Sequence, residues 1–254
     1  MTATLRTIRL IARRDKLFIA LLIAIVLAAT VSAGLGSAAI VERTEMALVF
    51  AGASIRLVVV LGLVIFVLFR LARLFASGEV ALMMSRPLTR TRFVVAVWAG
   101  YGAVALVLLV PACAAIWLVG PPPLDGFLLW GLSLVLETSL MVAVALFFGL
   151  ALASPVSAAV VVLGFYVLAR MTRFFIAIFD AAWADQTGVF ATVAEGALTV
   201  VSAVVPRLDL FGRTEWLVHG AAFAPADWLM LVQWAVYLPL VLAATAFDFR
   251  RRRL

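Results

Sequence analysis

Six long apolar runs constrain this chain more than any other feature of its sequence. A helix needs about 20 mostly apolar residues to cross about 30 Å of hydrocarbon. Only 13% of the 254 residues are charged and 67% are hydrophobic, whereas a soluble domain carries roughly 25% charged residues. The sequence therefore predicts an all-α integral membrane protein with six transmembrane helices. The predicted spans are residues 17–39, 56–76, 93–119, 127–152, 157–179 and 228–248.

Two further segments are predicted to be helical without spanning the membrane. Residues 189–205 are apolar, but they carry Glu195 in their middle and are followed by Pro206. We interpret them as a re-entrant or surface helix, within an extracytoplasmic segment of residues 180–227. Near the N-terminus, basic residues recur at three- and four-residue steps up to Lys16. This pattern fits an amphipathic helix on anionic lipid, and equally a simple basic anchor.

The distribution of basic residues predicts the orientation in the membrane. Lysine and arginine near span ends stay on the cytoplasmic side. Fourteen of the 20 lie in the N-terminal segment, in the loop between spans two and three, or in the C-terminal tail. With six spans these three places share one face, so both termini are expected to be cytoplasmic. The opposite face is assigned Arg43, Arg56, Arg207 and Arg213.

Several function classes lack the residues that they need. The chain has one cysteine, Cys113, and one histidine, His219, so it cannot build an internal disulfide or a Cys/His metal cage. Its single lysine, Lys16, follows no glycine-rich loop, so the phosphate-binding loop of ATPases is absent. We expect no catalytic residue, metal or cofactor on this chain. The net charge of +7 sits at span ends, so nucleic-acid binding is not expected either.

Three short stretches occur in a characteristic order. The first is Ser77-Gly78-Glu79-Val80-Ala81-Leu82-Met83-Met84-Ser85-Arg86-Pro87-Leu88-Thr89-Arg90-Thr91-Arg92. The second is Val205-Pro206-Arg207-Leu208-Asp209-Leu210-Phe211, and the third is Phe249-Arg250-Arg251-Arg252-Arg253-Leu254. Together with six spans, they resemble permease subunits of type-2 ATP-binding-cassette exporters over the whole chain. Three places depart from that pattern, at residues 74–77, at Val97 and at Arg253, where the family often has acids, a lysine and an aspartate.

The resemblance implies a half-transporter in a bacterial inner membrane. Two permease copies, expected as a homodimer among membrane lipids, would work with separate ATPase subunits that bind ATP and Mg. The absence of a phosphate-binding loop in this chain agrees with that division of labour. The substrate stays open.

The loop of residues 77–92 is expected to couple the permease to the ATPase. Its first half favours a helix that a proline ends, two methionines offer adaptable apolar contacts, and three arginines suit acids on a soluble partner. The alternative is a solvated basic loop without a partner. The candidate coupling residues are Gly78, Glu79, Met83, Met84, Arg86, Pro87, Arg90 and Arg92.

Charged residues inside the predicted spans are candidates for a function, because a charge at the bilayer centre costs about 2.5–3.5 kcal/mol. Glu137 lies about ten residues from the outer end of span four, roughly 15 Å deep, and Arg170 lies at a matching depth in span five. We predict that they pair, with Arg173 one turn nearer the outside. The pair either locks the two spans together or lines a path for a polar or anionic substrate.

Two other classes compete with the exporter interpretation. An intramembrane lipid-modifying enzyme needs a nucleophile with a base, or paired acids with a metal, within the spans. Glu137 is the only clear intramembrane acid, so paired-acid chemistry lacks a partner. A secondary transporter is expected to carry inverted repeats or broken helices, and the two halves of this sequence show no convincing repeat.

Overall fold

The computed structural model describes residues 16–38, 42–78, 89–152, 154–183, 205–221 and 225–251. In these ranges, six helices are long and apolar enough to cross a membrane. The six-span, all-α membrane fold predicted from the sequence is therefore confirmed. The long helices are α2 (Lys16–Ser37), α3 (Arg43–Ala76), α5 (Arg90–Val119), α6 (Leu124–Ala151), α7 (Pro155–Trp183) and α10 (Pro225–Arg251).

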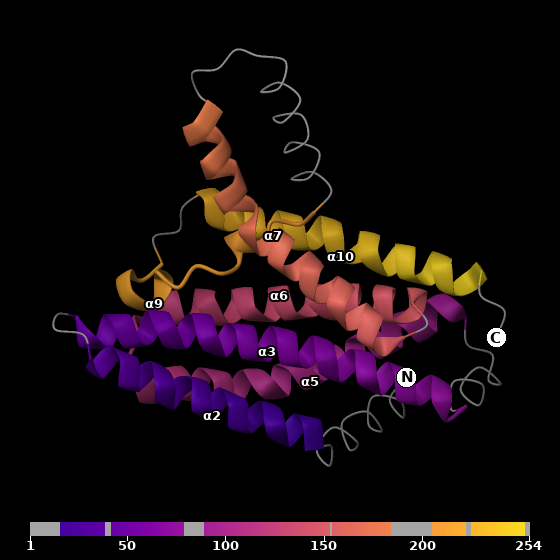
Figure 1. Cartoon of the computed structure of the whole chain (residues 1–254), viewed down its shortest axis with the longest axis horizontal. Helices are drawn as coiled ribbons and strands as arrows, with labels where there is room; N and C mark the ends of the chain where they lie inside the picture. Colours follow the sequence, from indigo (N-terminus) through magenta and orange to yellow (C-terminus); the bar gives the residue numbers. More distant parts are fainter. Residues whose placement is uncertain are drawn as a thin grey trace.

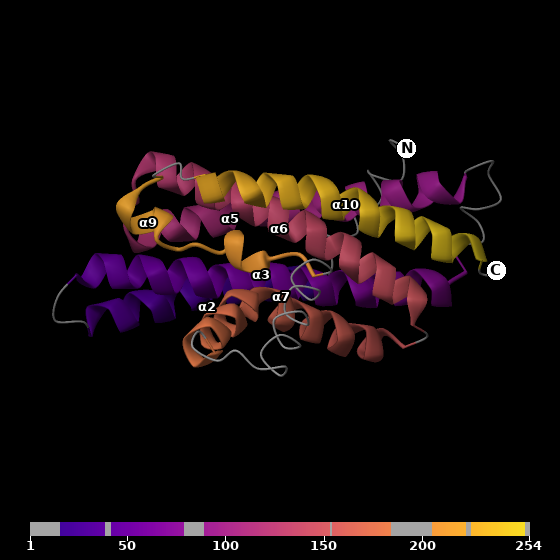
Figure 2. The ribbon, with the colours of Figure 1, turned by 90° about the horizontal axis from the view of Figure 1, so that it is seen from above.

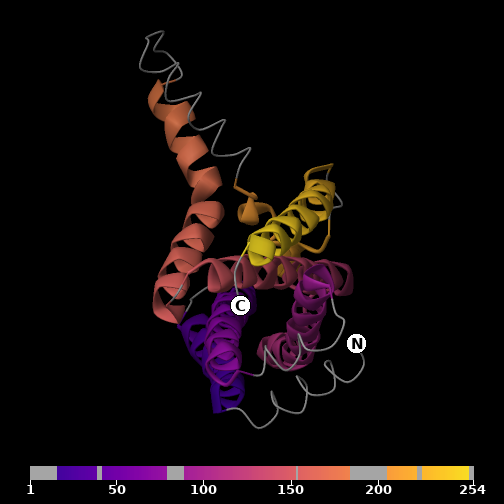
Figure 3. The same cartoon turned by 90° about the vertical axis from the view of Figure 1, so that its right-hand side faces the viewer.

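Helix α6 is the centre of the bundle. It packs against α3, α5, α7 and α10, and most of its residues are buried. Helices α2 and α3 form an antiparallel hairpin along one side (Figures 1 and 2). Helix α7 packs on α6 and α3, and its second half leans away from the other helices (Figure 3). A side chain on the inward face of α6 can therefore reach several neighbouring helices.

The start of α3 corrects the predicted second span. The prediction began this span at Arg56 and placed that residue on the outer face, whereas α3 begins at Arg43. Leu48, Ala51 and Ile55 are all buried within this additional part of the helix. The prediction was wrong because an arginine usually marks the end of a span. Here the arginine lies in the interior, with a partner on another helix.

A short connecting segment, residues 205–221, folds back onto the bundle before α10. It contains the 3₁₀-helix η1 (Leu208–Leu210) and the four-residue helix α9 (Trp216–His219). Leu208, Phe211 and Leu217 are fully buried, and the segment contacts α3, α6, α7 and α10. The predicted helix of residues 189–205 lies outside the described residues except for Val205, and so does the predicted amphipathic helix except for Lys16.

The two ends of the bundle differ in charge. At one end, on the right in Figure 1, α2, α5 and α7 begin and α3, α6 and α10 end. At the other end α3 and α6 begin, and α9 lies nearby (Figure 1). We call the first the basic end because its described residues include Lys16, Arg70, Arg73, Arg90, Arg92, Arg250 and Arg251. The opposite end includes four acidic residues, Glu42, Glu45, Asp125 and Glu215, together with the basic Arg43 at the start of α3.

Candidate functional site

A buried ionic cluster lies in the middle of the bundle, around Glu137 of α6. This carboxylate is completely buried. Arg56 of α3 donates from Nη1 to Glu137 Oε2 at 2.6 Å, and this guanidinium is also completely buried. Arg56 Nη2 donates to Ser133 Oγ at 2.8 Å and to the carbonyl of Trp130 at 3.2 Å. A single arginine of α3 thus contacts three residues of α6 that lie along about two helical turns.

The predicted contact between Glu137 and Arg170 is present. Arg170 of α7 donates from Nη1 to Glu137 Oε1 at 3.2 Å. Tyr166, one turn earlier on α7, donates its hydroxyl to the same oxygen at 3.2 Å. Arg173 also lies in α7, but its side chain is outside the described part of the structure. The cluster therefore joins α3, α6 and α7 through one carboxylate.

Arg170 also holds the connecting segment. Its Nη1 donates to the carbonyl of Leu208 and its Nη2 to the carbonyl of Gly212, both at 3.3 Å. Gly212 lies so close to this guanidinium that a Cβ there would collide with Arg170 Nη1, Nη2 and Cζ. The absence of a side chain at position 212 is thus a condition for this contact.

Two other contacts fix the connecting segment to the bundle. The backbone N–H of Arg207 donates to Gln233 Oε1 of α10 at 2.7 Å. At the other end of the segment, the N–H of Ala221 donates to Asp125 Oδ2 of α6 at 2.9 Å. With Arg170, these contacts tie the segment to three helices.

The cluster carries more positive than negative charge. Its two guanidinium groups share one carboxylate, and Arg170 is 24% exposed while Arg56 and Glu137 are fully buried. Arg56 also lies over the Trp130 ring, 5.2 Å from the ring centroid. A buried ion pair need not make a protein more stable than a pair of apolar residues would. Removing one member is nevertheless costly, because the other charge is left buried without compensation. The cluster specifies how three helices pack.

Sequence reasoning missed Arg56 and Tyr166 as members of this cluster. Tyr166 precedes Arg170 by four residues, which places both on one face of a helix. Arg56 interrupts an apolar run that continues on both sides, with Ile55 before it and Leu57 after it. Both signals are present in the sequence. The sequence does not show which neighbouring helix each side chain contacts.

The candidate coupling residues divide between described and undescribed parts. Glu79, Met83, Met84, Arg86 and Pro87 lie outside the described residues. Gly78 follows α3 with a φ of 71°, in the left-handed region that favours glycine. This conformation ends α3 and starts the loop at the basic end.

Arg90 and Arg92, predicted to face a soluble partner together, differ in their surroundings. Arg92 is exposed. Arg90 instead turns toward α10, where its Nη1 donates to the carbonyls of Phe249 and Arg250, both at 2.8 Å. Arg250 Nη2 in turn donates to Thr91 Oγ1 at 2.8 Å. Arg90 therefore joins the first turn of α5 to the last turn of α10.

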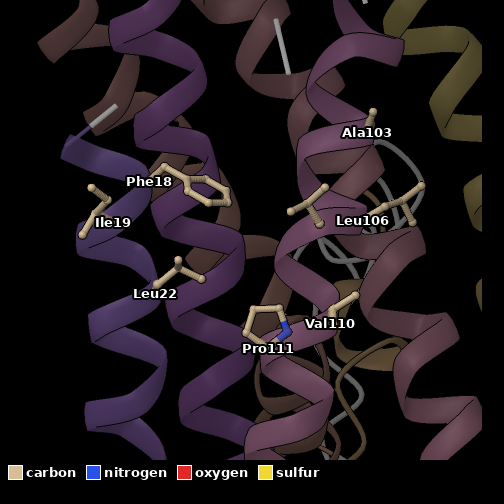
Figure 4. A pocket seen from close by; sticks show the side chains of 8 residues that line it. Phe18, Ile19, Leu22, Ala103, Leu106, Val110 and Pro111 are labelled. Carbon is tan, nitrogen blue, oxygen red and sulfur yellow. The ribbon is translucent and has the colours of Figure 1, made fainter. Parts of the chain in front are cut away.

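An apolar groove of about 710 Å³ lies between α2 and α5 (Figure 4). Its wall on α5 includes Val107 and Pro111. A proline lacks the N–H that would bond to the carbonyl four residues earlier, so the Val107 carbonyl loses its usual helical donor. The lining residues are Phe18, Ile19, Leu22, Ala103, Leu106, Val107, Val110 and Pro111.

Among the described residues, no three His, Cys, Asp or Glu side chains come together as a group able to hold a metal ion. No protein-family model matches the chain, and a comparison with curated proteins finds no match either.

Proposed function

We propose that this chain is the membrane-spanning permease half of an ATP-driven exporter, which moves its substrate by alternating access. A separate ATPase subunit would bind ATP and Mg and supply the energy. A second permease copy would complete the transporter. This proposal rests on the resemblance of three sequence stretches to type-2 ATP-binding-cassette permeases and on the position of the loop between α3 and α5.

The position of the two described ends of that loop is the observation that carries the proposal. Gly78 and Thr89 both lie at the basic end of the bundle, and Thr89 directly precedes Arg90, which contacts the end of α10. Basic ends of membrane proteins face the cytoplasm, which is where ATP is available. We therefore assign this end and both chain termini to the cytoplasmic side of a bacterial inner membrane. The loop is then within reach of a soluble ATPase.

The contacts of Glu137 do not suit it to act as a general base for intramembrane catalysis. A general base needs a free carboxylate oxygen within reach of its substrate. Both oxygens of Glu137 already accept bonds, Oε2 from Arg56 and Oε1 from Tyr166 and Arg170. A carboxylate held by three donors is suited to fix helix packing. This geometry gives no support to the alternative of a lipid-modifying enzyme that uses Glu137 as its base. The other alternative, a secondary transporter, is weakened only by the lack of a repeat between the two halves of the sequence.

Co-purification from the native membrane tests the proposal. The tagged chain should bring down a phosphate-loop ATPase in equal amounts, identified by mass spectrometry, and the complex should hydrolyse ATP. Recovery of the chain alone, without ATP hydrolysis, would contradict the exporter function.

A pair of charge reversals tests the loop itself. Arg86→Glu lies in the loop, whereas Arg73→Glu makes the same change at an exposed position of α3 at the same end of the bundle. The first should reduce ATPase recovery at least several-fold and the second should leave it close to wild type. Equal recovery with both variants would contradict the role of the loop.

A further inference from the structure

The first turn of α5 and the last turn of α10 form a reciprocal clamp at the basic end. We call the contacts among Arg90, Thr91, Phe93, Phe249 and Arg250 the α5–α10 clamp. Arg90 donates to two carbonyls of α10, and Arg250 donates back to Thr91 of α5. Each helix therefore supplies a donor and an acceptor. A relative displacement of the two ends would break contacts in both directions.

The clamp also contains an apolar contact between two aromatic rings. Phe249 is completely buried and stacks on Phe93, with ring centroids 5.5 Å apart and an angle of 19° between the planes. The Arg90 guanidinium lies over the Phe249 ring, 5.8 Å from its centroid. The hydrogen bond from Arg90 to the Phe249 carbonyl is partly buried, whereas the other two are exposed. The clamp therefore combines hydrogen bonds at the surface with a buried aromatic contact.

Arg90 binds carbonyls near the C-terminal end of α10. The two carbonyls belong to the last described turn of this helix. A cation close to the carbonyl end of a helix interacts favourably with the helix dipole. The position of Arg90 at this end of α10 therefore suits its charge.

The clamp begins where the candidate coupling loop ends. Thr89 is the N-cap of α5, its hydroxyl oxygen accepting from the N–H of Arg92 at 3.4 Å, and Arg90 follows at once. A displacement of the loop therefore reaches α5 through the chain and α10 through the clamp. No residue of the loop has to touch α10 for this to happen.

A second connection lies further along the same two helices. Trp98 of α5 donates to the backbone carbonyl of Ser139 at 3.0 Å, and Trp234 of α10 donates to the hydroxyl of the same serine at 2.7 Å. Trp98 lies about 12 Å along the helix axis from Arg90. Helices α5 and α10 are thus joined at their basic ends and again through α6.

We propose that Arg90 is a positioning residue that makes α10 move together with α5 when the ATPase acts on the loop. This inference rests on the proposed exporter function. It assigns different roles to two arginines that the sequence groups together. Arg90 transmits the movement to α10, whereas the exposed Arg92 leaves the connection between the helices unchanged. Arg92 therefore provides a matched control of the same residue type in the same helical turn.

The test follows ATP-dependent movement of each helix in the complete transporter. Spin labels are placed in a Cys113→Ser background, on α2 at Leu35→Cys and on either α5 at Leu118→Cys or α10 at Leu229→Cys, all exposed positions. Pulsed electron paramagnetic resonance spectroscopy then gives the α2–α5 and α2–α10 distances in lipid nanodiscs. Each distance is measured without nucleotide and with ATP held in the ATPase without hydrolysis. The measurement uses the permease together with its ATPase.

In the wild type, ATP should change both distances. Arg90→Ala should keep the α2–α5 change and reduce the α2–α10 change at least two-fold, while Arg92→Ala should keep both. Arg90→Lys should restore part of the α10 movement, because an ammonium can still donate to the helix-end carbonyls. Thr91→Val removes only the hydroxyl that accepts from Arg250, so it should reduce the α2–α10 change by a smaller amount. This variant keeps the inference testable if Arg90→Ala folds poorly.

Two results would overturn the inference while leaving the exporter function intact. One is a full α10 movement in both Arg90→Ala and Thr91→Val. The other is a wild-type complex that hydrolyses ATP and moves α5 without moving α10. If the chain binds no ATPase, that result would instead contradict the proposed function, and with it the inference.

Discussion

At the residue scale, Glu137 determines the central packing of the protein. Its carboxylate accepts from Arg56, Arg170 and Tyr166, so three helices meet at one negative charge. Loss of that charge would leave two buried or half-buried guanidinium groups facing each other. Loss of Arg170 would instead leave a neutral pair of Arg56 and Glu137. The members of the cluster are therefore unequal.

We predict that Glu137→Gln destabilises the protein by about 3–5 kcal/mol, and that Arg170→Gln costs less. Thermal unfolding in detergent measures both. Glu215→Gln is the control, since it makes the same chemical change at an exposed position and should unfold like the wild type. Equal losses for Glu137→Gln and Arg170→Gln would contradict this account of the cluster.

The close approach of Gly212 to Arg170 gives a second prediction. Gly212→Ala should cost about 1–3 kcal/mol, because the added methyl group displaces the Arg170 guanidinium and breaks its hydrogen bonds to the carbonyls of Leu208 and Gly212. In Gly164→Ala, on the same helix as Arg170, the new methyl group meets open space. That variant should be neutral or slightly stabilised, since alanine favours a helix over glycine. Similar unfolding temperatures for the two variants would argue against the close contact.

The sequence revealed one of the two ion pairs at this site. Glu137 and Arg170 lie at equal depth on consecutive helices, and a short turn between α6 and α7 makes them neighbours. Arg56 is separated from Glu137 by 81 positions in the chain. Apolar periodicity gives the depth of a residue along its helix, but it does not give the neighbour that a distant helix will have. The contact with Arg56 therefore required the structure.

At the element scale, most helix boundaries followed from the apolar runs. Helices α5 and α6 begin at Arg90 and Leu124, three residues before the predicted spans, because helices continue past the hydrocarbon into the interface. Helix α3 differed by a full 13 residues at its start, Arg43 against the predicted Arg56. There, the sequence pattern places the end of a span at Arg56, whereas the structure pairs this residue with Glu137 inside the bundle.

Ser139 connects α5, α6 and α10, and its two acceptors are chemically separable. Ser139→Ala removes the hydroxyl that accepts from Trp234 and keeps the carbonyl that accepts from Trp98. We predict that Ser139→Ala and Trp234→Phe are non-additive by about 0.5–1.5 kcal/mol. Ser139→Ala and Trp98→Phe should be additive. Double-mutant cycles from thermal or denaturant unfolding measure both, and equal coupling in the two cycles would contradict the assignment.

At the scale of the whole molecule, charge asymmetry between the two ends predicts one orientation. The basic end should face the cytoplasm, and the end with Glu42, Asp125 and Glu215 should face outward. The orientation depends on the membrane and the insertion machinery, and so it is a property that the fold alone does not contain.

Cysteine labelling measures this orientation. In a Cys113→Ser background, Glu215→Cys should react with a membrane-impermeant maleimide in intact spheroplasts. Arg92→Cys, at the basic end and also exposed, should react only after the membrane is permeabilised. The opposite labelling pattern would show that the topology is reversed. The loop between α3 and α5 would then lie outside the compartment that contains ATP.

The length of α3 has a mechanical consequence. Its 34 residues make a rod of about 51 Å at 1.5 Å per residue, whereas the hydrocarbon layer is about 30 Å thick. Its last two turns carry Arg70 and Arg73, so we expect the part of α3 outside the hydrocarbon to lie at the basic end, where the loop begins. In the proposed exporter, an ATPase bound to the loop would therefore act on the end of one rigid helix, and its movement would pass along α3 into the bundle.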